Sequence, residues 1–247
     1  MIIQLHLKPH TTAILPAAYN SRLQGVIYDL LSSQEDYSTF LHDNGYGENP
    51  TGYKVFCFGP LQGKYRFDRK TRTIFFETDH TISWEIRGHD AIFCRILMDA
   101  LLEREKILIA DQRLELVSCE VMEPEIHRNR VSIRMQSPIV VSRTIEKDGR
   151  SFTKYYNPLD VEFDELIKGN YLRKYQAFYG FPPSGEIRLS ARKIGLQDKT
   201  VTRYRGIYIT GWGGEYQLEG APDSIRFLYE TGLGTRNSSG FGMFDII

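Results

Sequence analysis

The sequence predicts an α+β protein built from two tandem ferredoxin-like (RRM-like) domains, each with the order strand–helix–strand–strand–helix–strand. Three observations lead to this fold class. The 247 residues suffice for two domains of common size. Hydrophobic residues make up 41% and charged residues 25%, as in soluble globular proteins. The same order of element types occurs twice, which predicts one domain over 1–123 and a second over 124–247.

The first half begins with an alternating strand and then changes period. Residues 2–8 alternate apolar and polar side chains, as a half-buried strand does. Leu23, Ile27 and Leu30 share one face of a helix. The remaining expected elements are a short helix over 35–42, a glycine-containing loop over 43–52, a strand over 53–61, a hairpin over 64–79, a helix over 88–105 and strands over 107–122.

The second half repeats this order with weaker patterns. We expect a strand over 130–142, a helix over 159–179 that breaks at Gly169, and a long hairpin that pairs 186–194 with 203–220. A helix over 221–233 and a closing strand over 240–247 complete the unit.

Composition and the positions of apolar, cysteine and charged residues exclude some classes of protein and favour others. No apolar run approaches the 18 residues of a transmembrane helix, and the start lacks the basic and apolar regions of a signal peptide. Cys57, Cys94 and Cys119 lie far apart, which favours free thiols and a cytoplasmic location. Residues 1–124 carry 13 basic and 17 acidic side chains, whereas residues 125–247 carry 18 and 14. The second half is therefore the better candidate for binding a polyanion, although chance scatter also explains so small a difference.

A glycine-rich segment, GLGTRNSSGFG, lies at 232–242 between a predicted helix and the last strand. Glycines let backbone N–H groups approach an anion closely, and Arg236 adds a charge at the tip. The segment lacks the G-K-[ST] of a phosphate-binding P-loop, and its strand follows the glycines instead of preceding them. A purely structural turn remains the alternative interpretation.

The glycine-rich segment and its continuation, GLGTRNSSGFGMF, resemble the C-terminal glycine-rich loop of the Cas6 family of CRISPR RNA-processing endoribonucleases. The stretches YNSRLQGVIYDLL (19–31) and FLHDNG (40–45) resemble the first helices of that family. The resemblance covers the whole chain. It implies the RAMP type of ferredoxin-like fold, no metal ion and no cofactor. The reaction it implies is attack of a 2′-hydroxyl on the adjacent phosphate, which leaves 2′,3′-cyclic phosphate and 5′-hydroxyl ends.

Such a reaction needs a group that exchanges protons near neutral pH and a cation or donor for the phosphate charge. Histidine suits the first task, and among six histidines His42 stands out at the end of a short helix. The resemblance implies Tyr28, His42 and Lys54 as the catalytic set. The stretch from His42 to Lys54 is longer than the family's usual gap, so GYGENPTG resembles an insertion, and Lys64 or an arginine could replace Lys54. Tyr28 also fits a core aromatic residue, and His42 a helix end.

Basic residues on the predicted strands of the second half form the candidate RNA surface, together with the glycine-rich loop. A solvated edge strand is the alternative interpretation of these charges. The candidate RNA-binding residues are Arg128, Arg130, Arg134, Arg188, Arg192, Lys193, Lys199, Arg203, Arg205, Gly232, Gly234, Arg236, Asn237, Ser238, Gly240 and Gly242. The residues show no RNP1 pattern, so recognition of the shape and backbone of a repeat is favoured over base stacking.

The resemblance implies CRISPR repeat RNA as the partner, and it leaves open a homodimer and transfer of the product to an interference complex. Two other functions stay open. One is a non-catalytic RNA-binding protein of the same fold. The other is a ferredoxin-like protein that binds a small anion or a protein. If RNA binding responded only weakly to salt concentration, this last function would be favoured.

Overall fold

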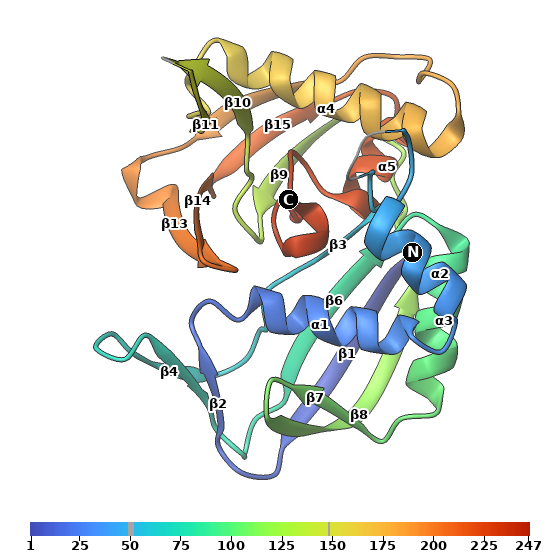
Figure 1. Cartoon of the computed structure of the whole chain (residues 1–247), viewed down its shortest axis with the longest axis vertical. Helices are drawn as coiled ribbons and strands as arrows, with labels where there is room; N and C mark the ends of the chain where they lie inside the picture. Colours follow the sequence, from blue (N-terminus) through green and yellow to red (C-terminus); the bar gives the residue numbers. More distant parts are fainter. Residues whose placement is uncertain (49–51, 148) are drawn as a thin grey trace.

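The computed structural model describes residues 1–48, 52–147 and 149–247. Two antiparallel sheets form the core of the molecule, the N-terminal one in the lower part of Figure 1 and the C-terminal one in the upper part. In each, the unit's first strand lies between its third and fourth strands, and the second strand lies at an edge. This is the order of a ferredoxin-like sheet, so the predicted fold class is confirmed.

The N-terminal sheet has five strands in the order β3-β6-β1-β8-β7. Ile3, Leu5 and Leu7 are fully buried on alternate positions of β1, as the predicted alternation requires. Two helices pack against this buried face. The elements are β1 (Ile2–Pro9), α1 (Asn20–Leu31), β3 (Phe56–Phe58), β6 (Ile82–Gly88), α3 (Ala91–Leu102), β7 (Lys106–Ile109) and β8 (Gln112–Met122).

A short helix and a small sheet complete the N-terminal half. Helix α2 (Glu35–Thr39) continues into a π-helical turn over Phe40–Asn44. The predicted hairpin is confirmed as β4 (Tyr65–Asp68) and β5 (Thr73–Phe76), and β2 (Ala13–Pro16) adds a third strand to it.

The C-terminal sheet has four strands in the order β12-β15-β9-β16. Its strands are β9 (Arg130–Met135), β12 (Arg188–Lys193), β15 (Glu215–Glu219) and β16 (Phe244–Ile246). Helices α4 (Glu162–Tyr179) and α5 (Pro222–Thr231) supply Phe163, Tyr171 and Phe227 to its core. The segment 123–129 connects the two sheets, and the division at 123/124 into separately folding units stays a prediction.

Two hairpins extend from this half, and the predicted pairing of 186–194 with 203–220 is wrong in part. Strand β12 pairs with β15, while β13 (Lys199–Tyr204) pairs with β14 (Ile207–Trp212). Arg205 and Gly206 close that hairpin with φ of 46° and 87°, as a tight two-residue turn requires. The second hairpin, β10 (Ser142–Lys147) with β11 (Arg150–Tyr155), was absent from the sequence-based expectation.

Three other boundaries differ from expectation. Helix α4 runs through Gly169 without a break, because the buried Ile167 and Tyr171 on either side hold it to the sheet at a greater gain than the roughly 1 kcal/mol that glycine costs. The strand expected over 130–142 ends at Met135, where Gln136 turns and donates its N–H to Met243 O. The strand expected over 240–247 is limited to 244–246, because 240–242 belongs to the glycine-rich loop.

Within the described ranges, no helix is long and apolar enough to cross a membrane.

Candidate functional site

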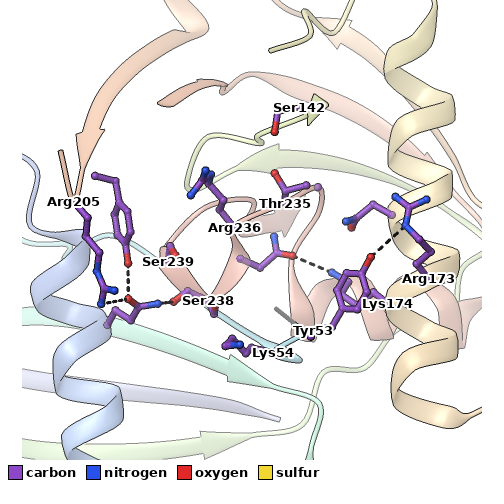
Figure 2. Close-up of a pocket in the computed structure, with 16 residues that line it drawn as sticks. Tyr53, Lys54, Ser142, Arg173, Lys174, Arg205, Thr235, Arg236, Ser238 and Ser239 are labelled. Atoms are coloured by element: carbon purple, nitrogen blue, oxygen red, sulfur yellow. Dashed lines mark hydrogen bonds between the residues drawn. The ribbon is translucent and has the colours of Figure 1, made fainter. Parts of the chain in front are cut away.

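A cavity of about 790 Å³ opens between the two halves of the chain. Figure 2 shows basic side chains around it that come from distant segments. Its basic lining residues are Lys54, Arg173, Lys174, Arg205 and Arg236. None of the described residues that line it is acidic. A wall of this kind attracts a polyanion.

The glycine-rich loop forms one wall of the cavity. Its backbone has positive φ at Arg236 (62°) as well as at its glycines, and a 3-10 turn over Asn237–Ser239 lies at its tip. Asn237 holds the loop from within, because its Nδ2 donates to Leu233 O at 2.9 Å and to Phe241 O at 3.0 Å. The loop therefore has one defined shape.

Lys174 on α4 fixes this loop to the helix. Its ammonium is buried and donates to Gly232 O at 2.6 Å, Asn237 Oδ1 at 3.1 Å and Thr231 O at 3.4 Å. Burial lowers the pKa of Lys174 to about 7. The sequence analysis missed this residue, although a lysine three positions after Tyr171 on the apolar face of a helix was a signal.

Gln24 on α1 connects the loop to the β13–β14 hairpin. Its Nε2 donates to Ser238 O at 2.7 Å, and its Oε1 accepts from Tyr204 Oη at 2.5 Å and Arg205 Nη2 at 3.0 Å. Asn20 on the same helix donates to Ser239 O and Gly240 O. The sequence analysis missed Gln24, whose signal was an amide beside the buried Leu23 on the apolar face.

Tyr28 and His42 lie together, edge to face, with ring centroids 5.4 Å apart. Burial raises the pKa of Tyr28 to about 12, with Tyr204 adding to the shift and Arg205 opposing it. Both of these neighbours line the cavity. The His42 side chain is 63% exposed, and its Nδ1 lies 2.6 Å from Asp43 Oδ1.

Lys54 reaches the same region despite its distance from His42 in the sequence. Tyr46 and Tyr53 exchange two backbone hydrogen bonds of 2.8 and 2.7 Å, which close the intervening loop at its base. Burial lowers the pKa of Lys54, and the charge of Asp43 opposes that shift. The expected insertion 45–52 is thus closed at its base, with 49–51 outside the described residues.

The predicted RNA-binding residues fall into two groups. Gly234, Arg236, Asn237, Ser238 and Arg205 line the cavity, and Gly232, Gly240 and Gly242 shape the loop behind them. The others lie elsewhere on the C-terminal half, in the segment 123–129, on the C-terminal sheet or on β13. They are Arg128, Arg130, Arg134, Arg188, Arg192, Lys193, Lys199 and Arg203.

The basic side chains on the C-terminal sheet alternate with acidic ones. Arg130 pairs with Glu219 at 2.9 Å and Arg134 with Glu215 at 2.8 Å. The expected pairing of 186–194 with 203–220 would set Arg188 and Arg192 opposite Arg203 and Arg205. That arrangement is wrong, because β12 pairs with β15. Lys199 begins β13 and does not lie at a hairpin tip. Arg130 and Arg134 are thus opposed by carboxylates, whereas the described residues that line the cavity include no acidic side chain.

Residues 121–246 match the family model described as "CRISPR associated protein Cas6, C-terminal". The chain belongs to the Cas6 family. The resemblance noted in the sequence is thereby confirmed. A curated Cas6 relative, the "CRISPR-associated endoribonuclease Cas6" of Pyrococcus furiosus, is 27% identical over 233 residues, which cover 94% of this chain and 83% of the relative.

Solved structures agree on the Cas6 fold. "Characterization of a Cas6-related gene from Pyrococcus furiosus" describes a chain that superimposes with a TM-score of 0.86 at 22% identity, covering 100% of this chain and 98% of that one. "An RAMP protein binding different RNA substrates" gives 0.82 at 20% identity, with coverage of 100% and 99%.

Proposed function

We propose that this chain is an endoribonuclease that cleaves precursor CRISPR RNA within its repeats and needs no metal ion. The 2′-oxygen at the cleavage site gives up its proton and forms a bond to the adjacent phosphorus. The bond from phosphorus to the 5′-oxygen breaks, and that oxygen takes a proton. The products carry 2′,3′-cyclic phosphate and 5′-hydroxyl ends.

The observation that carries this proposal is the pairing of Tyr28 and His42 beside a cavity lined by basic side chains. His42 is exposed and exchanges the protons, a task that imidazole groups often perform in enzymes. Tyr28 keeps its proton, since its pKa is raised to about 12, and donates a hydrogen bond. Lys54 lines the cavity and stabilises the charge that grows on the phosphate.

The glycine-rich loop, Arg205 and Arg236 bind the RNA backbone at the same cavity. Guanidinium groups pair with phosphate oxygens through two parallel hydrogen bonds. The backbone N–H groups of the loop add donors where the chain approaches the ligand closely. The outlying basic residues of the C-terminal half extend the contact along the repeat.

The test is cleavage of end-labelled repeat RNA from the source genome in excess EDTA. We expect one cut by the wild type, a loss of at least roughly 100-fold in His42→Ala, and no cut when the nucleotide before the scissile bond is 2′-deoxy. His10→Ala is the matched control, because the His10 side chain is similarly exposed (60%) but lies beside Glu115 and not beside Tyr28.

Each contrary result points to a different failure. Tight binding without cleavage by the wild type would leave a non-catalytic RNA-binding protein. Cleavage that stops in EDTA would overturn metal independence. Full activity of His42→Ala would remove His42 from the reaction.

A further inference from the structure

A single buried carboxylate, Asp90, holds both ends of the segment that carries His42. Asp90 lies just before α3, where its Oδ1 accepts from Ile92 N at 2.8 Å. Its Oδ2 accepts from Tyr37 Oη and from Tyr46 Oη, each at 2.5 Å. Asp90 is only 5% exposed. It makes charge-assisted hydrogen bonds, which are stronger than those between neutral groups.

The two tyrosines enclose the π-helical turn. Tyr37 lies five residues before His42 and Tyr46 four residues after it. The turn itself ends at Gly45, whose N–H donates to Phe40 O at 2.7 Å. Single π-helical turns within helices often occur at functional sites. Since the His42 side chain is 63% exposed, its own packing restrains it little, and the backbone of 37–46 must set its position.

Tyr46 also connects this segment to Lys54 and to the other half of the chain. Its backbone pairs with Tyr53, the residue before Lys54. Its ring packs edge to face against Phe178 of α4, with centroids 4.9 Å apart. Burial, followed by the bonds to Asp90, raises the pKa of both Tyr37 and Tyr46, so both hydroxyls remain donors.

We infer that Asp90, Tyr37 and Tyr46 form a positioning clamp that sets the positions of His42 and Lys54 relative to each other. The clamp rests on the proposed function, because it acts through these two residues and touches no substrate. A displacement of about 1 Å at a reacting group can cost roughly 100-fold in rate. Releasing the clamp therefore slows the chemical step and leaves RNA affinity unchanged.

The test uses Tyr37→Phe, Tyr46→Phe and the double variant, which remove the hydroxyls and keep the rings. We expect single-turnover cleavage at saturating enzyme to fall by about 10-fold in each and by about 100-fold in the double variant. The Kd for 2′-deoxy repeat RNA stays within about 2-fold, since the clamp does not contact Arg205, Arg236 or the glycine-rich loop, which bind the RNA backbone. Tyr216→Phe is the control, because the buried Tyr216 hydroxyl has no partner among the described residues.

Asp90→Asn provides a second route if the tyrosine variants unfold. Its side-chain oxygen can still accept from Ile92 N, whereas its amide nitrogen cannot accept from the tyrosines. We expect Asp90→Asn to slow cleavage by about as much as the Tyr37→Phe, Tyr46→Phe double variant does, about 100-fold. If the folded double variant or Asp90→Asn cleaves at the wild-type rate while His42→Ala is inactive, the clamp alone is overturned. The clamp is also overturned if these variants lose cleavage rate and RNA affinity in parallel. Full activity of His42→Ala overturns the proposed function and the clamp with it.

Discussion

Tyr28 illustrates how burial selects a role for a single side chain. Its hydroxyl lies near Tyr204 and Arg205 at the cavity, and its ring packs at 5.4 Å from His42. Because its pKa is about 12, the hydroxyl stays protonated throughout the range in which histidine titrates. In the proposed reaction, Tyr28 would therefore donate a hydrogen bond to the reacting phosphate, and His42 would be the group that changes its protonation.

We expect Tyr28→Phe to slow cleavage by roughly 10- to 100-fold, at or below the lower end of what a positioned proton donor contributes. The pH–rate curve between pH 6 and 9 should keep its wild-type shape, because Tyr28 would lose its proton only near pH 12, above that range. Single-turnover rates at half-unit pH steps measure this. An alkaline limb present in the wild type and absent from the variant would contradict the assignment.

The sequence pointed to Tyr28, His42 and Lys54 through resemblance, and their catalytic roles stay predictions. It did not point to Gln24, Lys174 or Asp90. Each of these acts on a partner distant in the chain, as Gln24 does on Ser238, 214 residues away. Such a partner becomes visible only in the folded chain. For Gln24 and Lys174, the sequence does carry a local signal, a polar side chain on an apolar helix face.

At the scale of elements, the glycine-rich loop depends on backbone conformations that other residues resist. Gly242 has φ of 78°, and a Cβ there would lie 2.0 Å from Leu233 O and 2.6 Å from Asn237 Nδ2. Gly180, after α4, has nearly the same φ (79°) with nothing within 4 Å of a Cβ. The two positions separate backbone strain from steric conflict.

We expect Gly180→Ala to lower the free energy of unfolding by about 1 kcal/mol, the cost of a left-handed alanine. Gly242→Ala should lower the free energy of unfolding by at least about 2 kcal/mol more than Gly180→Ala does, because the loop must also shift. It should weaken RNA binding as well, while Gly180→Ala should not. Urea unfolding and RNA titration measure both. Equal effects of the two substitutions would show that the loop adapts freely.

The elements themselves were more predictable than their partners. Alternation and helical periodicity located β1, α1, α3 and α5 to within a few residues. The expected pairing of 186–194 with 203–220 was wrong in part, because an alternating pattern states which face is buried and not which strand lies beside it. The Arg205–Gly206 turn was the local signal that separates β13–β14 as a hairpin of its own.

At the scale of the whole molecule, one arginine joins the two sheets. Arg87 on β6 is 1% exposed, and its guanidinium donates to Phe244 O at 2.6 Å and to Asp245 Oδ1 at 2.7 Å, both on β16. It also pairs with Glu85 and stacks over the ring of Tyr229 at 3.7 Å. The cavity also draws residues from both halves, and the Arg87 contact is one of those that hold the two halves together.

We expect Arg87→Met to reduce the free energy of unfolding by about 3–5 kcal/mol, because it leaves Glu85 and Asp245 without their shared cation. Arg95→Met, at an exposed arginine on α3, should change it by less than about 0.5 kcal/mol. Trp84 and Trp212 report one half each, so urea unfolding in single-tryptophan backgrounds shows whether both transitions move. If Arg87→Met unfolded at the same urea concentration as the wild type, Arg87 would not couple the stabilities of the two halves.

The two backbone hydrogen bonds between Tyr46 and Tyr53 affect how the length of the loop between His42 and Lys54 can change among homologues. Its two hydrogen bonds use main-chain atoms alone, although Gly52 beside it has no room for a side chain, since a Cβ there would lie 2.1 Å from Asn44 O. Lengthening a flexible loop is cheap, at about 0.6 kcal/mol for each doubling. Evolution can therefore vary the number of residues between His42 and Lys54 while both ends stay fixed. In distant homologues, an alignment that demands constant spacing here would discard true counterparts of Lys54.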